Sequence, residues 1–275
     1  MKKHRYCKKT FSVSCVLVVL LILAAVLAPA FLPYAYNQAE PTQAFQAPGP
    51  EHLMGTDKLG RDVFSRVVYG TRYSLSSALM LVSCVFLVGT VLGILAGYFG
   101  GALDALIMRL ADMMISFPGM VLAIAIAGIM GSSLLNAILA LTAVSWTKYA
   151  RLARSFVLKV KNRDFVTAAR ISGARHGYLI RRYMLPNVLP ALVVTATTDI
   201  GTMIMELATL SFLGFGATAP LPEWGVMLNE GRAHIQSAPW LMVYPGLAIF
   251  ITVVVFNLFG DGLRDLMDPR DHGKE

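Results

Sequence analysis

The chain has 275 residues, a mass of 29.9 kDa and a mean hydropathy of +0.62, and only 15% of its residues are charged. A soluble domain carries about 25% charged residues, so this composition excludes an ordinary water-soluble fold. With 56% hydrophobic residues it also excludes a disordered chain. The formal net charge of +8 would suit a nucleic-acid-binding protein. However, no pattern of interleaved aromatic and basic residues accompanies it, so we expect no nucleic-acid partner.

Long segments without charged residues predict membrane-spanning helices, because about 20 apolar residues cross the hydrocarbon core. Strands are not expected, since these runs are continuously apolar and lack the alternation of a membrane barrel. The charge-free run 113–147 is too long for one span and is interrupted by Gly and Ser, so we interpret it as a hairpin of two helices. We therefore predict an all-α integral membrane protein with six spans, at about 12–32, 75–98, 116–130, 134–150, 188–210 and 241–260.

The basic residues predict the orientation, because Lys and Arg accumulate on the cytoplasmic side of membrane proteins. With the N-terminus inside, 19 of the 24 Lys and Arg residues fall in cytoplasmic segments and 5 fall outside, so both termini are predicted to be cytoplasmic. The first apolar run is too long for a secretory signal, and we expect a retained anchor. The predicted organisation is a basic head (1–10), the anchor (11–32), an extracytoplasmic segment (33–74), a five-helix core (75–260) with a cytoplasmic loop (151–187), and a cytoplasmic tail (261–275).

The most polar part of the chain, between the fourth and fifth predicted spans, has the pattern of two short helices. Asp164 is a good N-cap for the first helix, which would end near Gly173, where glycine permits a turn. The second helix would cover 176–185, and Pro186 would lead into the fifth span. These features predict a compact helix–turn–helix that faces the cytoplasm and is ringed by Arg170, Arg175, Arg181 and Arg182.

This loop resembles the cytoplasmic signature of ABC importer permeases, which reads Glu-Ala-Ala, three residues, Gly, nine residues and Ile-x-Leu-Pro. The spacing matches without a gap at Ala168, Ala169, Gly173, Leu185 and Pro186. Small alanines would allow another surface to approach closely. Two positions depart from the signature: Thr167 stands where Glu is usual, and Tyr183 where Ile or His is usual. The alternative reading is a basic loop that serves only topology, and such a loop does not require this spacing.

The resemblance extends over about residues 10 to 270 and is strongest to the second permease of the oligopeptide, dipeptide and nickel importers. Matching blocks lie at 52–72, 100–118, 211–225 and 261–270, in the order found in the family. The first block contains Gly55-Thr56-Asp57 and Gly60-Arg61-Asp62. The resemblance implies a fold like that of type I ABC importer permeases, with a cytoplasmic coupling helix–turn–helix.

The resemblance also implies partners. The chain would pair with a homologous second permease, two ATP-binding subunits and an extracytoplasmic substrate-binding protein in the bacterial cytoplasmic (inner) membrane, and would carry short peptides or nickel. It lacks the Gly-x4-Gly-Lys-Ser/Thr phosphate loop, so we expect no enzyme activity and no bound cofactor, with ATP and Mg held by the partner ATPases. Coupling to the ATPases would involve Asp164, Thr167, Ala168, Ala169, Gly173, Leu185 and Pro186.

Two acids lie within the fifth predicted span, where a charged side chain costs about 3 kcal/mol and should not face lipid. Asp199 and Glu206 are seven residues apart and share a helical face. Either they line the pathway or its outer gate, or they make polar contacts with a neighbouring span or the partner permease. The alternative function is a secondary transporter that uses both acids for protons, although no inverted repeat is detectable. The histidines lack the spacing of metal ligands, so we expect no metal site and no catalytic residues.

Overall fold

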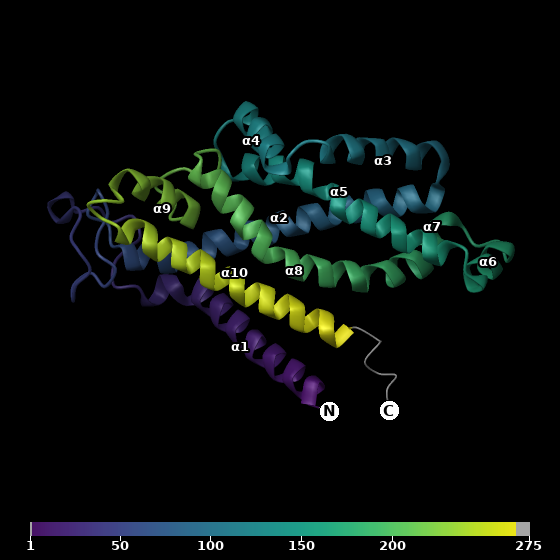
Figure 1. The fold of residues 1–275 in the computed structure, drawn as a ribbon, viewed down its shortest axis with the longest axis horizontal. Coiled ribbons are helices and arrows are strands. Elements are labelled where there is room, and N and C mark those ends of the chain that lie inside the picture. The colour runs from purple at the N-terminus through teal and green to yellow at the C-terminus, as the bar shows by residue number, and fades with distance from the viewer. Residues whose placement is uncertain (1, 268–275) are drawn as a thin grey trace. The chain divides into compact units, whose positions relative to one another are not determined.

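The computed structural model describes residues 2–267, and within them the only pairing of strand type is an isolated β-bridge between Thr56 and Asp62. The all-α prediction is therefore confirmed. The Asp268-Pro269-Arg270 block and the rest of the predicted tail from 268 onward lie outside the described residues. The helices (Figure 1) are α1 (Lys2–Phe31), η1 (Pro41–Gln43), α2 (Val63–Phe99), α3 (Gly101–Ile115), α4 (Gly119–Met130), α5 (Leu134–Lys161), α6 (Asp164–Ile171), α7 (His176–Leu179), the π-helical turn η2 (Ile180–Met184), α8 (Leu185–Phe212), α9 (Trp224–Gly231), η3 (Arg232–His234) and α10 (Trp240–Met267).

Three continuous helices in the described part of the chain are long and apolar enough to cross a membrane, namely Val63–Phe99, His176–Phe212 and Trp240–Met267. The second of these joins α7, the π-helical turn and α8. The pair formed by α3 and α4 is a fourth candidate, bent by 94°. The predicted first span, 12–32, lies within α1 except for its last residue. The predicted fourth span, 134–150, lies within α5. The count of six spans exceeds these candidates and stays a prediction.

The structure corrects the third predicted span. One helix was expected over 116–130, but α4 begins at Gly119 and has 12 residues. At 1.5 Å per residue this helix is about 18 Å long, less than the roughly 30 Å of a hydrocarbon core. Pro118 explains the break, because proline disfavours helical backbone in the residue before it, here Phe117. The helix on the other side of this break, α3, was not predicted.

The described chain forms two compact units, and the first comprises Met1–Met80, Ala127–Leu139 and Thr197–Glu275. Within this unit α1 lies alongside α10, and α9 also contacts α10 (Figure 1). Its hydrophobic core surrounds Trp224, which is only 1% exposed. The Trp224 indole Nε1 donates a hydrogen bond of 2.9 Å to the Val67 carbonyl. This bond and the surrounding apolar contacts fix α9 to the beginning of α2.

The second unit comprises Leu81–Ile126 and Ala140–Ala196. Glycines recur every four residues along the part of α2 that belongs to this unit, and they face α5. A Cβ atom added at Gly93 would lie 2.7 Å from the Cβ of Ala153, and one added at Gly97 would lie 2.9 Å from the Cβ of Val157. The two helix backbones therefore approach more closely than larger residues would allow, as small residues at four-residue spacing permit.

Two ion pairs join α3 to α5 in the second unit. The Arg154 guanidinium donates to both carboxylate oxygens of Asp104, at 2.5 and 2.6 Å. One turn earlier on α5, Arg151 pairs with Asp112, and both of these side chains are exposed. The apolar side of α3 contributes Ile107 and Ala111 to a buried cluster with α2 and α5. This unpredicted helix is thus held to α5 both by packing and by ion pairs.

Candidate functional site

The segment that carries the sequence signature forms two short helices, α6 and α7, joined by residues 172–175. Gly173 in this turn has φ +82°, a left-handed conformation that favours glycine. The Gly173 amide donates to the Arg170 carbonyl at 3.0 Å, and the Ala174 amide donates to the Ala169 carbonyl at 3.1 Å. This pair of bonds is a Schellman motif, which ends α6 by satisfying its last carbonyl groups.

Both ends of the predicted helix–turn–helix differ from expectation. Asp164 is not the N-cap: Arg163 occupies that position without a side-chain bond, and Asp164 is the first residue of α6. A carboxylate there still interacts favourably with the positive end of the helix dipole. The second helix begins at His176 but does not end near 185, because α7 continues through a π-helical turn into α8 and His176–Phe212 is one continuous helix. Pro186 lies near the beginning of α8, and because it has no amide proton it cannot donate a helical hydrogen bond to the preceding π-helical turn.

The surface of α6 and α7 combines apolar and basic side chains. Phe165, Ile171 and Tyr178 are 48%, 82% and 55% exposed, whereas Val166 and Leu179 are fully buried and anchor the helix pair. Among the signature residues, the exposed ones are Asp164, Thr167, Ala168, Gly173 and Pro186, and the partly buried ones are Ala169 and Leu185. Within the described residues no ion pair neutralises the exposed guanidinium groups of this segment, which belong to Arg163, Arg170, Arg175, Arg181 and Arg182.

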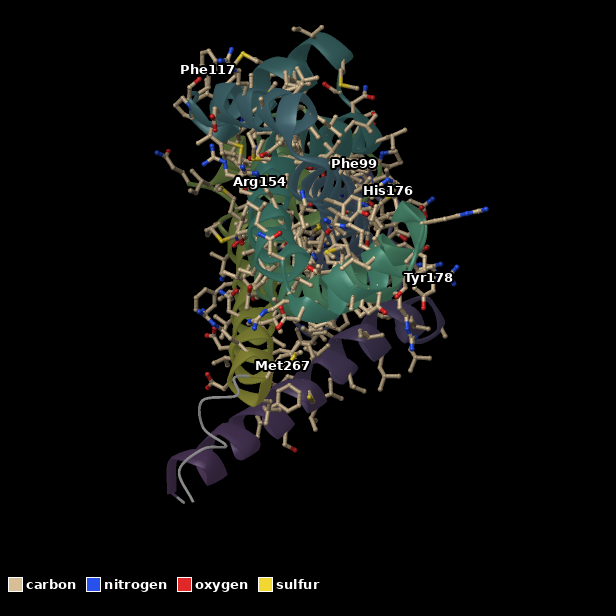
Figure 2. The ribbon with its side chains drawn as sticks, turned by 90° about the vertical axis from the view of Figure 1, so that its right-hand side faces the viewer. Phe99, Phe117, Arg154, His176, Tyr178 and Met267 are labelled. Atoms are coloured by element: carbon tan, nitrogen blue, oxygen red, sulfur yellow. The ribbon has the colours of Figure 1, made fainter. Side chains whose placement is uncertain are left out.

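One side-chain hydrogen bond ties this segment to a neighbouring helix. The Tyr98 hydroxyl, near the end of α2, lies 2.8 Å from Nδ1 of His176, the first residue of α7. Phe99 and His176 lie close together in Figure 2, and their ring centroids are 6.0 Å apart. Lys161, the last residue of α5, places its Nζ 6.0 Å from the centre of the Tyr98 ring and 3.4 Å from the Gly97 carbonyl oxygen. The ends of α2 and α5 and the start of α7 therefore meet at Tyr98.

The two acids of the fifth predicted span both lie on α8 in the first unit. Asp199 is buried, and Glu206, two turns further along, is partly buried. Their segment packs tightly against α10, because a Cβ added at Gly201 would lie 2.7 Å from Oδ1 of Asn257. Neither acid therefore stands on a fully exposed face, as expected for carboxylates at this depth.

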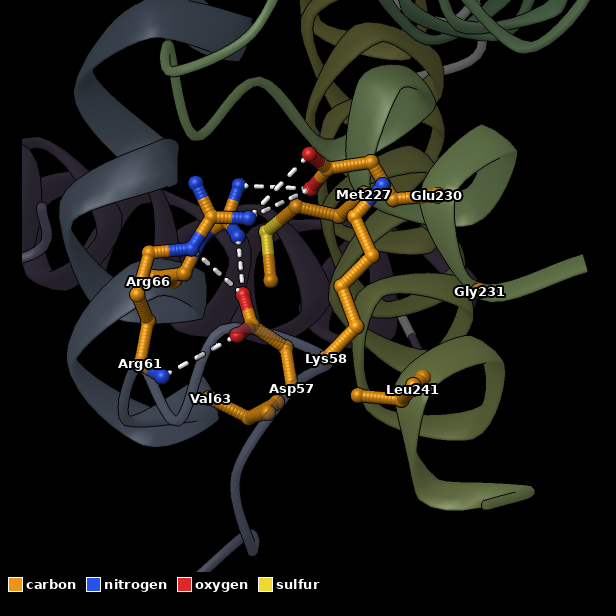
Figure 3. Close-up of a pocket in the computed structure, with 9 residues that line it drawn as sticks. All are labelled: Asp57, Lys58, Arg61, Val63, Arg66, Met227, Glu230, Gly231 and Leu241. Atoms are coloured by element: carbon orange, nitrogen blue, oxygen red, sulfur yellow. Dashed lines mark hydrogen bonds and ion pairs between the residues drawn. The ribbon is translucent and has the colours of Figure 1, made fainter. Parts of the chain in front are cut away.

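A second charged site, which the sequence reasoning missed, links the beginning of α2 to α9. We call it the Asp57 cluster, and it consists of Asp57, Arg61, Arg66 and Glu230 (Figure 3). Arg61 Nε lies 2.6 Å from Asp57 Oδ2, and Arg61 Nη2 lies 3.1 Å from Glu230 Oε1. Arg66 also pairs with Asp57, and its Nη2 lies 2.8 Å from Glu230 Oε2. Each arginine thus bridges both carboxylates.

Burial and charge act in opposite directions on Asp57. Desolvation alone would raise the pKa of its carboxyl group. The guanidinium groups of Arg66 and Arg61 and the amides of Arg61 and Leu59 outweigh this effect and lower the pKa below its ordinary value. The matching block at 52–72 contains three of the four residues of the cluster, but nothing in the sequence pointed to Glu230, which is more than 160 positions from Arg61 and Arg66.

Glu223 is another buried acid that the sequence reasoning did not single out for a site. It is 1% exposed and caps α9, accepting hydrogen bonds from the Gly225 amide at 2.9 Å and the Val226 amide at 3.0 Å. Burial raises the pKa of its carboxyl group, although these bonds oppose the shift. Within the described residues no group of three His, Cys, Asp or Glu side chains is placed to hold a metal ion.

Known protein families and relatives match this chain over most of its length. Residues 89–271 match the family described as "Binding-protein-dependent transport system inner membrane component", and residues 8–48 match the "N-terminal TM domain of oligopeptide transport permease C". The chain is 44% identical to the "Dipeptide transport system permease protein DppC" of Alkalihalophilus pseudofirmus, over 94% of this chain and 85% of the relative. It is 43% identical to the "Nickel transport system permease protein NikC" of Escherichia coli (strain K12), over 92% of each chain.

Solved structures agree on the fold. A chain of the MetNI methionine ABC transporter in an inward-facing conformation has a TM-score of 0.59 at 19% identity, covering 74% of this chain and 98% of that chain. An amino acid ABC transporter solved with histidines has a TM-score of 0.54 at 19% identity, covering 75% of this chain and 94% of that chain. The fold and the resemblance predicted from the sequence are both confirmed, and the family is one of permease subunits.

Proposed function

The chain belongs to the family of inner membrane components of binding-protein-dependent transport systems, and from this premise we propose that it forms half of the translocation pathway of an ABC importer for short peptides or nickel. The other half would be a homologous permease, so that the pathway lies in a heterodimer. Two ATP-binding subunits would supply the energy, and an extracytoplasmic binding protein would deliver the substrate. The assembly would lie in the bacterial cytoplasmic membrane, with both termini of this chain in the cytoplasm.

The observation that carries this proposal is the surface of α6 and α7. A helix pair that exposes Phe165, Ile171 and Tyr178 beside unpaired arginines has both the apolar area and the charge of a contact surface. Small Ala168 on this surface admits the close approach of a partner. We infer that the pair docks into a cleft of the ATPase and that this cleft carries acidic groups opposite the arginines. Closure of the ATPases would then move α6 and α7 and, through them, the spans.

For the substrate, we propose short peptides first and nickel second, because the relatives include permeases named for dipeptides, nickel and glutathione. Asp199 and Glu206 would face the pathway or its outer gate, where carboxylates attract the ammonium group of a peptide or a metal cation. Uptake of labelled dipeptide and of nickel by the same cells discriminates between the two substrates.

Co-purification tests the assembly. The tagged chain extracted in mild detergent should bring down a second permease and ATP-binding subunits. The alternative of a proton-coupled secondary transporter requires none of them, so recovery of this chain alone, with full uptake and no response to ATP depletion, would contradict the proposal.

Substitution of Gly173 tests the docking role. Leucine in place of Gly173 must adopt a left-handed backbone and adds bulk to the turn between α6 and α7, so we expect ATP hydrolysis to continue while uptake is lost. Gly131→Leu is a matched control. Gly131 has φ +86° and, like Gly173, has no atom within 4 Å of an added Cβ, but it lies between α4 and α5. Equal uptake by both variants would contradict docking through α6 and α7.

A further inference from the structure

The chain itself joins α7 to α8 through the π-helical turn, and side-chain contacts attach α6 and α7 to the other helices of the second unit. Their buried side chains, Val166 and Leu179, are aliphatic and resist separation without fixing direction, because the hydrophobic effect is non-directional. In the described part of the chain, the bond between Tyr98 and His176 is the only side-chain hydrogen bond that joins residues 164–179 to another helix.

The surroundings of this bond hold both partners in place. Tyr98 is only 5% exposed, and its ring meets the His176 ring edge-on, at 79° with 5.7 Å between centroids. Phe99 meets the Tyr98 ring at 89° and 5.1 Å, and Lys161 lies over that ring. Behind Tyr98, the close contact of Gly97 with Val157 fixes α2 against α5. The hydroxyl of Tyr98 is therefore presented from a rigid base.

His176 is placed so that its hydrogen bond to Tyr98 can transmit a movement of α6 and α7. His176 is the first residue of α7, immediately after the turn that contains Gly173. A movement of α6 and α7 would displace this turn, and the hydrogen bond between His176 and Tyr98 would transmit the displacement to α2. An apolar contact at the same place would allow the helices to slide past each other.

We propose that Tyr98 is a positioning residue for energy coupling: its hydrogen bond to His176 latches the helix pair α6–α7 to α2 and transmits the motion of the pair to that span. This inference rests on the proposed docking of α6 and α7 on the ATPase. When His176 carries its proton on Nε2, Nδ1 accepts the hydroxyl proton of Tyr98, and when the proton is on Nδ1 the ring donates to the Tyr98 oxygen, so the bond forms with either tautomer. The latch predicts that coupling, rather than assembly, depends on the Tyr98 hydroxyl.

Tyr98→Phe tests the latch in the complete importer reconstituted in vesicles, with ATP hydrolysis and substrate uptake measured on the same preparation. The variant keeps the ring and its packing and loses only the hydroxyl. We expect hydrolysis within about twofold of wild type and about a fivefold fall in substrate transported per ATP, the scale of one net hydrogen bond. Tyr244→Phe on α10 is the control and should leave the ratio unchanged.

Variants of His176 separate the latch from a merely structural role. His176→Asn keeps an acceptor oxygen close to the place of Nδ1 and should retain most of the coupling, whereas His176→Phe should lose as much as Tyr98→Phe. The double variant with both phenylalanines should lose no more than either single variant, because both remove the same bond. A structural role would instead lower the amount of assembled complex and leave the transport ratio unchanged.

The outcomes distinguish this inference from the proposed function. If Gly173→Leu uncouples the importer but Tyr98→Phe transports normally per ATP, the latch is refuted and the docking role stands. If Gly173→Leu has no effect, or no ATPase assembles with the chain, the proposed function is refuted and the latch with it. A loss of transport per ATP in the double variant that equals the product of the two single losses would also refute the latch.

Discussion

Arginine is used in opposite ways in two regions of this molecule. In the Asp57 cluster, Arg61 and Arg66 are 3% and 1% exposed, and each contacts both carboxylates. In the segment 163–182, which contains α6 and α7, the arginines are exposed and have no carboxylate partner within the described residues. A guanidinium buried without a partner would be very costly, so the cluster must satisfy its charges internally. The arginines of α6 and α7 keep their charge available for another molecule.

The charge of a side chain therefore says little about its role until the groups that contact it are known. The paired arginines hold α9 to the beginning of α2, and removing one leaves its partners charged and buried. The exposed arginines form no ion pair with the described part of the chain. Substitutions in the first region should therefore affect stability, and substitutions in the second should affect association.

The largest effect is expected from Arg66→Ala. This change removes one of the two guanidinium groups that contact Asp57 and Glu230 and leaves the buried Asp57 and the partly buried Glu230 with Arg61 alone, which should lower the free energy of unfolding by about 3–5 kcal/mol. Thermal unfolding of the purified chain in detergent measures the loss. Arg66→Lys, which keeps the charge but not the two-pronged geometry, should recover part of it. A wild-type unfolding temperature for Arg66→Ala would show that the cluster contributes no stability.

The acid sensitivity of the Asp57 cluster should be the next largest effect. The folded pKa of Asp57 is lowered from its ordinary value of 3.8. Its charge therefore contributes stability that is fully present above pH 3.8 and is lost as the pH falls through the lower folded pKa. Unfolding temperatures measured in steps below pH 5 should fall, and Asp57→Asn should reduce the slope of this fall. An unchanged slope in Asp57→Asn would assign the acid sensitivity to other groups.

Arg170→Gln combined with Arg175→Gln tests the other side of the comparison. We expect unfolding to change by less than about 0.5 kcal/mol, because both side chains are exposed and unpaired. The affinity for the ATPase should fall about fivefold, and its dependence on salt should weaken, because screened charges have been removed. Binding of purified ATPase at 50 and 300 mM salt measures both quantities. If the double variant binds the ATPase as tightly as wild type and binds vesicles of anionic lipid less tightly, the arginines contact the membrane surface instead.

The smallest effect is expected from Arg151→Ala. Arg151 pairs with Asp112, but both side chains are about half exposed or more, at 46% and 65%. Exposed pairs contribute about 0.2–1 kcal/mol. Unfolding temperatures of Arg151→Ala and Arg66→Ala, measured under the same conditions, compare the exposed ion pair with the buried one. A loss as large as that of Arg66→Ala would mean that exposure does not decide the strength of these pairs.

Much of the fold could be predicted from local patterns, and the failures have local causes too. The apolar runs identified the helices of the predicted spans, and Gly173 marked the end of α6 because the turn needs a left-handed residue. The break before Gly119 was missed because an apolar run does not reveal a bend, although Pro118 gave a signal. Asp164 was misplaced by one residue because aspartate is favourable both as N-cap and in the first turn of a helix.

The candidate sites divide in the same way. The signature from Ala168 to Pro186 was readable because its residues are close in sequence and their spacing sets the turn. The bond between Tyr98 and His176 and the pairing of Arg66 with Glu230 join residues that are 78 and 164 positions apart. Nothing in a single sequence records such partners, because a side chain finds its partner only when separate helices pack.

Hydrophobic runs and turn residues act over a few neighbouring positions, so they were enough to predict a helical chain that enters a membrane and carries a permease signature. Which charges are neutralised and which stay exposed followed only from the packing of the helices. That outcome depends on burial, and burial is a property of the packed chain: the same guanidinium group binds two carboxylates at Arg66 and meets no carboxylate of the described chain at Arg170.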